Sequence, residues 1–156
     1  MIQRVQTIYL FLTALCLLLV FGFDIAHYAD SAGIESQLSL YKLTKANGEV
    51  GDVLFGMPPV IVLSITSALF LAAIAFYKNR PLQIKLVRIG YALIMASVVL
   101  LWYFVSENYW TLDIKDVDFG YAASFFFPFG AFAFALLANR GIIADEKLIK
   151  SLDRLR

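Results

Sequence analysis

Four long apolar stretches alternate with polar segments along the chain. The first two, 5–23 and 59–77, each run for 19 residues without a charge. The other two, 86–105 and 119–138, are as apolar, apart from Arg88 near the start of the third. A helix needs roughly 20 apolar residues to cross about 30 Å of hydrocarbon. The pattern therefore predicts four transmembrane helices in one integral membrane domain.

The first polar segment, 24–58, has the signals of a β-hairpin. Residues 37–44 favour an extended strand, and 50–55 would form the return strand. Asn47-Gly48 between them is a strong hairpin signal, because both turn positions need a positive φ. A lone hairpin is marginal in water, so we expect a third strand or a surface that covers it.

The second polar segment, 106–118, supplies a candidate for that third strand. Between Trp110 and Lys115, apolar and polar residues alternate with a period of two. This alternation is typical of a strand with one buried face. We expect segments 24–58 and 106–118 to form a small β-containing cap, a hairpin plus one strand, on one side of the membrane.

The fourth apolar stretch is unusually aromatic. We expect a bend at its proline. The aromatic run predicts either a pocket for a quinone or a lipid tail, or packing against lipid and neighbouring helices. The hydroxyls of Ser64, Thr66 and Ser67 in the second stretch would be available to such a ligand. The candidate apolar ligand residues are Phe125, Phe126, Phe127, Pro128 and Phe129.

The last segment, 139–156, is polar, and its end predicts an amphipathic helix over 144–156. Asp145 and Glu146 would occupy its first turn, where acids favour the helix dipole. The apolar face would dock on a partner or lie on anionic lipid, and the sequence leaves both open. The two faces of this helix carry Leu148, Ile149, Leu152 and Leu155 on the apolar side, and Lys147, Lys150 and Arg154 on the cationic side.

Composition and charge support this threading. Apolar residues make up 61% of the chain, against about 45–50% in soluble domains. Ten of the thirteen Lys and Arg residues fall in the N-terminus, the turn after the second stretch and the tail. Cations favour the cytoplasmic side, so both termini should be cytoplasmic. The cations of the turn that would set this topology are Lys78, Arg80, Lys85 and Arg88.

Candidate chemistry is sparse. Cys16 and His27 are the only cysteine and histidine, so we expect no disulfide within the chain and no metal site or other cofactor. None of the four stretches has a charge near its centre, where proton relays and transporters usually place one. The net charge of +1 gives no reason to expect a nucleic-acid partner. These features argue against an enzyme or a transporter.

The two ends of the chain carry recognisable motifs. The chain opens with Met1-Ile2-Gln3-Arg4-x-Gln6-x-x-Tyr9-Leu10 and closes with Asp145-Glu146-Lys147-Leu148-x-x-Ser151-Leu152-Asp153-Arg154-Leu155-Arg156. With four spans between them, it resembles a family of small integral membrane proteins of Bacteroidota, known as a domain of unknown function. The resemblance implies a bacterial inner membrane with a periplasmic cap. It supplies no activity and no catalytic residues.

The sequence thus predicts an all-α membrane protein: a four-helix bundle, a small periplasmic β-cap and a C-terminal amphipathic cytoplasmic helix. We expect a non-catalytic accessory or scaffolding subunit of an inner-membrane complex, for example in secretion, translocation or envelope machinery. It would dock through the tail helix and the cap, with membrane lipids and other integral membrane subunits as partners. The alternative is a lipid- or quinone-binding protein that uses the Phe-rich stretch.

Overall fold

The computed structural model describes residues 2–29, 35–44, 50–51, 57–111 and 118–153. Within them lie four long helices and a small sheet. The helices are α1 (Ile2–Leu19), α2 (Met57–Ala75), α3 (Arg80–Thr111) and α4 (Phe127–Asp153), and a short 3-10 helix, η1 (Ala123–Phe126), precedes α4.

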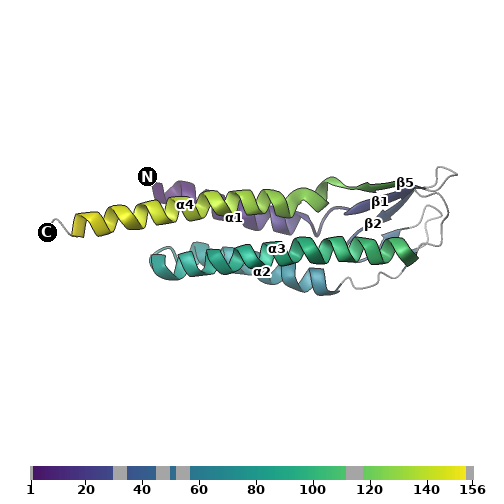
Figure 1. The fold of residues 1–156 in the computed structure, drawn as a ribbon, viewed down its shortest axis with the longest axis horizontal. Helices are drawn as coiled ribbons and strands as arrows, with labels where there is room; N and C mark the ends of the chain where they lie inside the picture. Colours follow the sequence, from purple (N-terminus) through teal and green to yellow (C-terminus); the bar gives the residue numbers. More distant parts are fainter. Residues whose placement is uncertain (1, 30–34, 45–49, 52–56, 112–117, 154–156) are drawn as a thin grey trace.

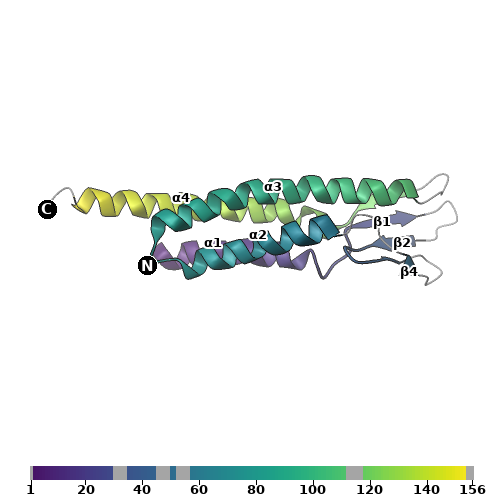
Figure 2. The same cartoon turned by 90° about the horizontal axis from the view of Figure 1, so that it is seen from below.

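The molecule is a long bundle with the sheet at one end (Figures 1 and 2). α1 packs against α2 and α4, and α3 packs against the same two helices from the other side. The start of α1, the α2–α3 turn and the end of α4 all lie at the end opposite the sheet. The structure therefore puts the first helix start, the cationic turn and the last helix end at one end of the bundle.

Small side chains let α4 approach its neighbours. Ala131, Ala135 and Ala138 follow one another at helical spacing and are fully buried. Between helices in a membrane the hydrophobic effect does not drive association, so close packing matters more, and small residues such as alanine let the backbones approach. On α1, Leu10 and Leu17 are fully buried as well and belong to the same core.

A second close approach joins α2 and α3. The ring of Phe70 on α2 lies against the backbone of Gly90 on α3, where an added Cβ would come within 2.5 Å of the ring. Phe70 is fully buried. Glycine at position 90 therefore makes the socket into which this ring fits.

The outside of the bundle is apolar, as in a membrane protein. Large hydrophobic side chains with about half of their surface exposed project from all four helices, among them Phe11, Ile61, Val99 and Phe129. Helices that are apolar all round are typical of membrane spans. Three helices are long and apolar enough to cross a membrane, and Val5–Leu19 is a shorter apolar helix.

The sheet is antiparallel, with the strand order β4-β3-β2-β1-β5. Its register pairs His27 with Gln37 on one side and with Gly120 on the other. The strands are β1 (Ala26–Ala29), β2 (Glu35–Leu38), β3 (Leu43–Thr44), β4 (Val50–Gly51) and β5 (Asp118–Tyr121).

The expected hairpin is part of a larger sheet. The prediction of one extended strand over 37–44 is wrong, because β2 and β3 pair with each other across a tight turn. The Ser39 N–H donates to the Lys42 carbonyl in that turn at 3.0 Å, and the Ser39 hydroxyl donates to the same oxygen at 3.1 Å. β3 and β4 pair as predicted, while Asn47 and Gly48 lie outside the described residues.

The third strand comes from a different place than the alternation at 110–115 predicts. α3 continues to Thr111, so Trp110 and Thr111 are helical, and residues 112–117 lie outside the described part. β5 instead begins at Asp118 and occupies the start of the expected fourth span. It pairs with β1, a strand that the sequence pattern did not indicate.

The C-terminal segment is not a separate helix. α4 runs without interruption from Phe127 to Asp153, so Asp145 lies deep inside a long helix rather than in a first turn. The expected mid-span bend at Pro128 is also wrong. Pro128 lies in the first turn of α4, where a helix does not need the N–H that proline lacks.

Tyr28 fastens the sheet to the bundle. Its side chain is buried, and its hydroxyl donates to the Val105 carbonyl on α3 at 3.2 Å. Its ring lies 5.6 Å from that of Phe119 and 6.1 Å from that of Tyr109, measured between centroids. Burial, with a smaller contribution from Tyr121, raises the pKa of the Tyr28 hydroxyl well above its usual range.

Candidate functional site

A cluster of three polar side chains joins three helices at the end opposite the sheet. Gln6 on α1 donates from Nε2 to Asp145 Oδ2 on α4 at 2.7 Å. Arg80, the first residue of α3, forms an ion pair with the same oxygen, with 3.5 Å between Nη1 and Oδ2. One carboxylate oxygen thus binds residues from two other helices.

The cluster is shielded from solvent. The exposed fractions of the side chains are 17% for Arg80 and 9% for Asp145, and Gln6 is buried. A charge withdrawn from water needs a partner, because removal of one member leaves the other buried and unpaired. The pair therefore holds α3 and α4 in one relative position more strictly than apolar packing would.

Gly141 makes room for this arrangement. An added Cβ at this position would lie 2.8 Å from Cγ of Gln6. Gly141 precedes Asp145 by four residues, so the two lie on the same side of α4. The glycine lets the Gln6 side chain cross the helix surface and reach the carboxylate.

The adjoining α2–α3 turn is fixed by two further amides. The buried Gln83 Nε2 donates to the Ala73 carbonyl near the end of α2 at 3.0 Å. Asn79 caps α3, because its Oδ1 accepts the Leu82 N–H at 3.3 Å. Helix ends leave backbone groups without helical partners, and these side chains bind one such group at each helix.

Beyond the cluster, α4 forms an arm that projects past the rest of the bundle (Figures 1 and 2). Ala144 and Lys147 are exposed, and Leu148 is 57% exposed. The arm continues to Asp153. Among the other predicted docking residues, Ile149, Lys150 and Leu152 are helical without described side chains, and Arg154 and Leu155 lie outside the described residues.

The predicted topology cations have different surroundings. Lys78, Lys85 and Arg88 are exposed, as cations beside water or lipid headgroups should be. Arg80 is instead drawn into the buried cluster. The sequence did not predict this cluster, because Gln6 and Asp145 are 139 residues apart. Nothing in the motifs around them indicates that the two side chains bond to each other.

The rings of the Phe-rich stretch contact one another as well as Phe23 and Tyr121. Phe125 and Pro128 are buried, Phe126 and Phe129 are about half exposed, and Phe127 lies between these extremes. The Phe125 ring lies 5.5 Å from that of Phe126 and 6.4 Å from that of Phe129, between centroids. Such contacts are typical of aromatic packing at a membrane edge, and a ligand pocket here stays a prediction.

The small hydroxyl residues of α2 bond within their own helix. Ser64 donates to the Val60 carbonyl at 2.8 Å, Thr66 to Val62 at 2.6 Å and Ser67 to Leu63 at 2.8 Å. A hydroxyl that bonds to the preceding turn satisfies its own donor inside the membrane. This arrangement favours a role in helix packing.

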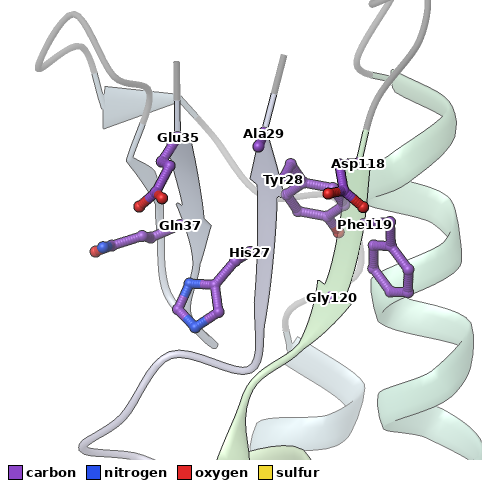
Figure 3. A pocket seen from close by; sticks show the side chains of 8 residues that line it. All are labelled: His27, Tyr28, Ala29, Glu35, Gln37, Asp118, Phe119 and Gly120. Carbon is purple, nitrogen blue, oxygen red and sulfur yellow. The ribbon is translucent and has the colours of Figure 1, made fainter. Parts of the chain in front are cut away.

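A shallow open groove lies on the sheet (Figure 3). It has a volume of about 320 Å³, and polar side chains from β1, β2 and β5 line it, among them His27, Glu35, Gln37 and Asp118. In the part of the chain that the structure describes, no group of three His, Cys, Asp or Glu residues could hold a metal ion. The groove is a feature of the sheet face.

The comparison with protein families covers almost the whole chain. A family model described as a domain of unknown function, DUF4293, matches residues 2–155. The chain belongs to the DUF4293 family. No curated protein matches it. In this DUF4293 chain, the opening motif that contains Gln6 and the closing motif that contains Asp145 meet in space through their hydrogen bond.

Proposed function

We propose that this chain is a non-catalytic accessory subunit of a bacterial inner-membrane complex, and that the end of α4 is its docking arm. The observation that carries the proposal is the continuous helix that leaves the bundle at Asp145 and presents Leu148 to the outside. An apolar side chain on an exposed helix suits a partner that offers a groove.

The buried cluster supports this function because it gives the arm a fixed base. A docking helix that is already oriented loses less entropy when it binds. Gln6 and Arg80 hold α4 just before the exposed segment begins, so the arm leaves the membrane domain in a defined direction. The sheet at the opposite end would be a second docking surface, in the periplasm.

The orientation completes the proposal. Four membrane crossings, with the cluster on the cytoplasmic side, agree with the bias of Lys and Arg toward the end of the bundle that holds both termini. Single cysteines at the exposed positions Tyr41 and Leu148, in a Cys16→Ser background, test this orientation. We expect a membrane-impermeant thiol reagent to label Tyr41→Cys in spheroplasts and Leu148→Cys only after permeabilisation. Labelling of both in intact spheroplasts would contradict the orientation.

Purification of the intact chain in mild detergent tests the docking function. We expect a stoichiometric companion that is lost from the Leu148→Glu variant. Tyr41→Glu, an equivalent change at an exposed site of the cap, is the matched control and should keep the companion. Release by Tyr41→Glu alone would assign docking to the cap, and recovery of the wild-type chain only as a lone monomer would exclude a subunit role.

A further inference from the structure

A tyrosine on α3 binds α4 in the half of the bundle that holds the cationic turn. The Tyr91 hydroxyl on α3 donates to the Ala135 carbonyl on α4 at 3.1 Å. Its ring packs edge-on against that of Phe132, with centroids 5.7 Å apart. These contacts fix the two helices at the level where Arg88 and Arg140 emerge.

Two arginines flank this tyrosine, one from each helix. Arg88 precedes Tyr91 by three residues on α3, and Arg140 follows Ala135 by five residues on α4. Because the two helices run antiparallel and Tyr91 bonds to Ala135 (Figure 1), both arginines lie within about two helical turns of this contact, on its side toward the α2–α3 turn. Both side chains are exposed. The described residues form an ion pair between Arg80 and Asp145. Neither Arg88 nor Arg140 takes part in it. In the described part of the chain, these two cations therefore lie at one level of the α3–α4 contact and outside the Arg80–Asp145 ion pair.

An apolar surface leads from the arginines toward the middle of the bundle. Met95 follows Tyr91 by four residues on α3, and Leu136 precedes Arg140 by four residues on α4. Residues at this spacing share a helix face. Met95 is 50% exposed and Leu136 is 37% exposed. The outer surface of this region thus has a cationic end and an apolar continuation. This layout matches that of a phospholipid, in which an anionic headgroup is followed by apolar acyl chains.

We propose that Arg88 and Arg140 form a binding site for the phosphate of an anionic phospholipid, such as phosphatidylglycerol, in the cytoplasmic leaflet. The planar guanidinium group binds phosphate oxygens through two hydrogen bonds at once. Basic sites between helices on the cytoplasmic side are suited to anionic headgroups. The acyl chains lie along Met95 and Leu136, and the lipid spans the outer surface of the α3–α4 contact.

This site is distinct from the docking arm. It uses none of the residues of the Gln6–Arg80–Asp145 cluster and does not involve Leu148. The phosphate of one lipid bridges two neighbouring cations and joins α3 to α4 from outside. The site would therefore bind lipid even in a chain that has no protein partner, and loss of docking leaves this proposal standing.

Native mass spectrometry of the detergent-purified full chain tests the site directly. The probes are dioleoyl phosphatidylglycerol, dioleoyl phosphatidylcholine with the same acyl chains, and inorganic phosphate. We expect the wild type to prefer phosphatidylglycerol over phosphatidylcholine by about 25-fold, since each of the two cations near an anionic headgroup strengthens binding by roughly fivefold. Inorganic phosphate should bind far more weakly than the lipid.

Two double variants make the assignment specific. Arg88→Gln/Arg140→Gln should lose the preference for phosphatidylglycerol. Lys78→Gln/Lys85→Gln removes the same charge from exposed positions at the same end and should keep it. An equal loss in both would show a diffuse cationic surface and overturn the site. Equal affinity of the wild type for both lipids, or phosphate binding as tight as lipid binding, would also overturn it.

A second measurement needs no variant. Phosphatidylglycerol with a photoreactive headgroup, reconstituted with the wild-type chain in phosphatidylcholine nanodiscs, should crosslink to peptides that contain Arg88 or Arg140. Crosslinks confined to the peptide of the α4 arm that contains Lys147 would place the lipid elsewhere and refute the proposal.

Discussion

At the sheet end of the bundle, Tyr28 is surrounded by the rings of Tyr109 and Phe119 and makes one hydrogen bond to α3. At the other end, Gln6, Arg80 and Asp145 meet around one carboxylate oxygen. The aromatic packing at the sheet end covers a broad area and tolerates small changes. The polar cluster depends on three groups, each of which needs the others. The first arrangement fixes the cap by buried area, whereas the second fixes the direction of α4.

The largest effect should come from loss of the Tyr28 ring. Tyr28→Ala removes a fully buried aromatic side chain and should lower the free energy of unfolding by about 3–5 kcal/mol. Titration with sodium dodecyl sulfate, followed by circular dichroism, measures this. Tyr28→Phe keeps the ring and removes only the hydrogen bond to Val105, so it should cost about 1 kcal/mol. Equal losses in the two variants would mean that the hydroxyl, and not the ring, fastens the cap.

The polar cluster should come next. Asp145→Ala leaves the Arg80 guanidinium buried without its partner, and we expect a loss of about 2–4 kcal/mol in the free energy of unfolding. In the same titration, the double variant Arg80→Met/Asp145→Leu should recover most of that loss, because apolar residues of similar size replace a buried ion pair at little cost. If the double variant were as unstable as the single one, charge burial would not be the cause.

The glycine socket on α3 offers a third test. Gly90→Ala pushes a methyl group into the Phe70 ring and should destabilise the chain by about 1–3 kcal/mol. Gly130→Ala is the matched control on α4, where an added Cβ meets nothing within 4 Å, and it should be neutral or slightly stabilising. Thermal unfolding of both variants in the same detergent gives the comparison. Equal effects would contradict the close approach of α2 and α3.

The smallest effect concerns pH. Burial raises the pKa of Tyr28, so the folded cap disfavours the tyrosinate. The stability that this neutral hydroxyl contributes is complete below the unfolded pKa of about 10 and is lost as the pH rises above it. We expect a loss of about 1 kcal/mol between pH 10 and pH 11, measured by circular dichroism. Tyr28→Phe should reduce this dependence.

The contrast between the two ends also explains what the sequence could predict. Charge-free runs such as 59–77 reveal apolar helices directly, because burial in lipid needs continuous apolar residues. The accumulation of Lys and Arg in the N-terminus, the turn and the tail indicates that these three segments lie on one side of the membrane. β5 could not be predicted, because residues 119–121 look like the start of the apolar stretch that follows them, and β5 pairs with β1 only through a contact distant in sequence.

The polar cluster was hidden for a related reason. Asp145 looks like a helix-start residue next to Glu146, and Arg80 looks like one of several topology cations. Only the packing of α1 beside α4 brings Gln6 within 2.7 Å of Asp145. Local patterns describe the helices, whereas the choice of which polar residues become buried depends on how the helices pack.

The claim that the cluster fixes the arm is tested most directly by a distance distribution. Spin labels at Lys78→Cys and Leu148→Cys, both exposed positions, would be measured by pulsed electron paramagnetic resonance in a Cys16→Ser background. We predict one narrow distribution for the intact cluster and a clearly broader one when Asp145→Ala is added. A broad distribution with the cluster intact, or one that Asp145→Ala leaves unchanged, would contradict a fixed arm.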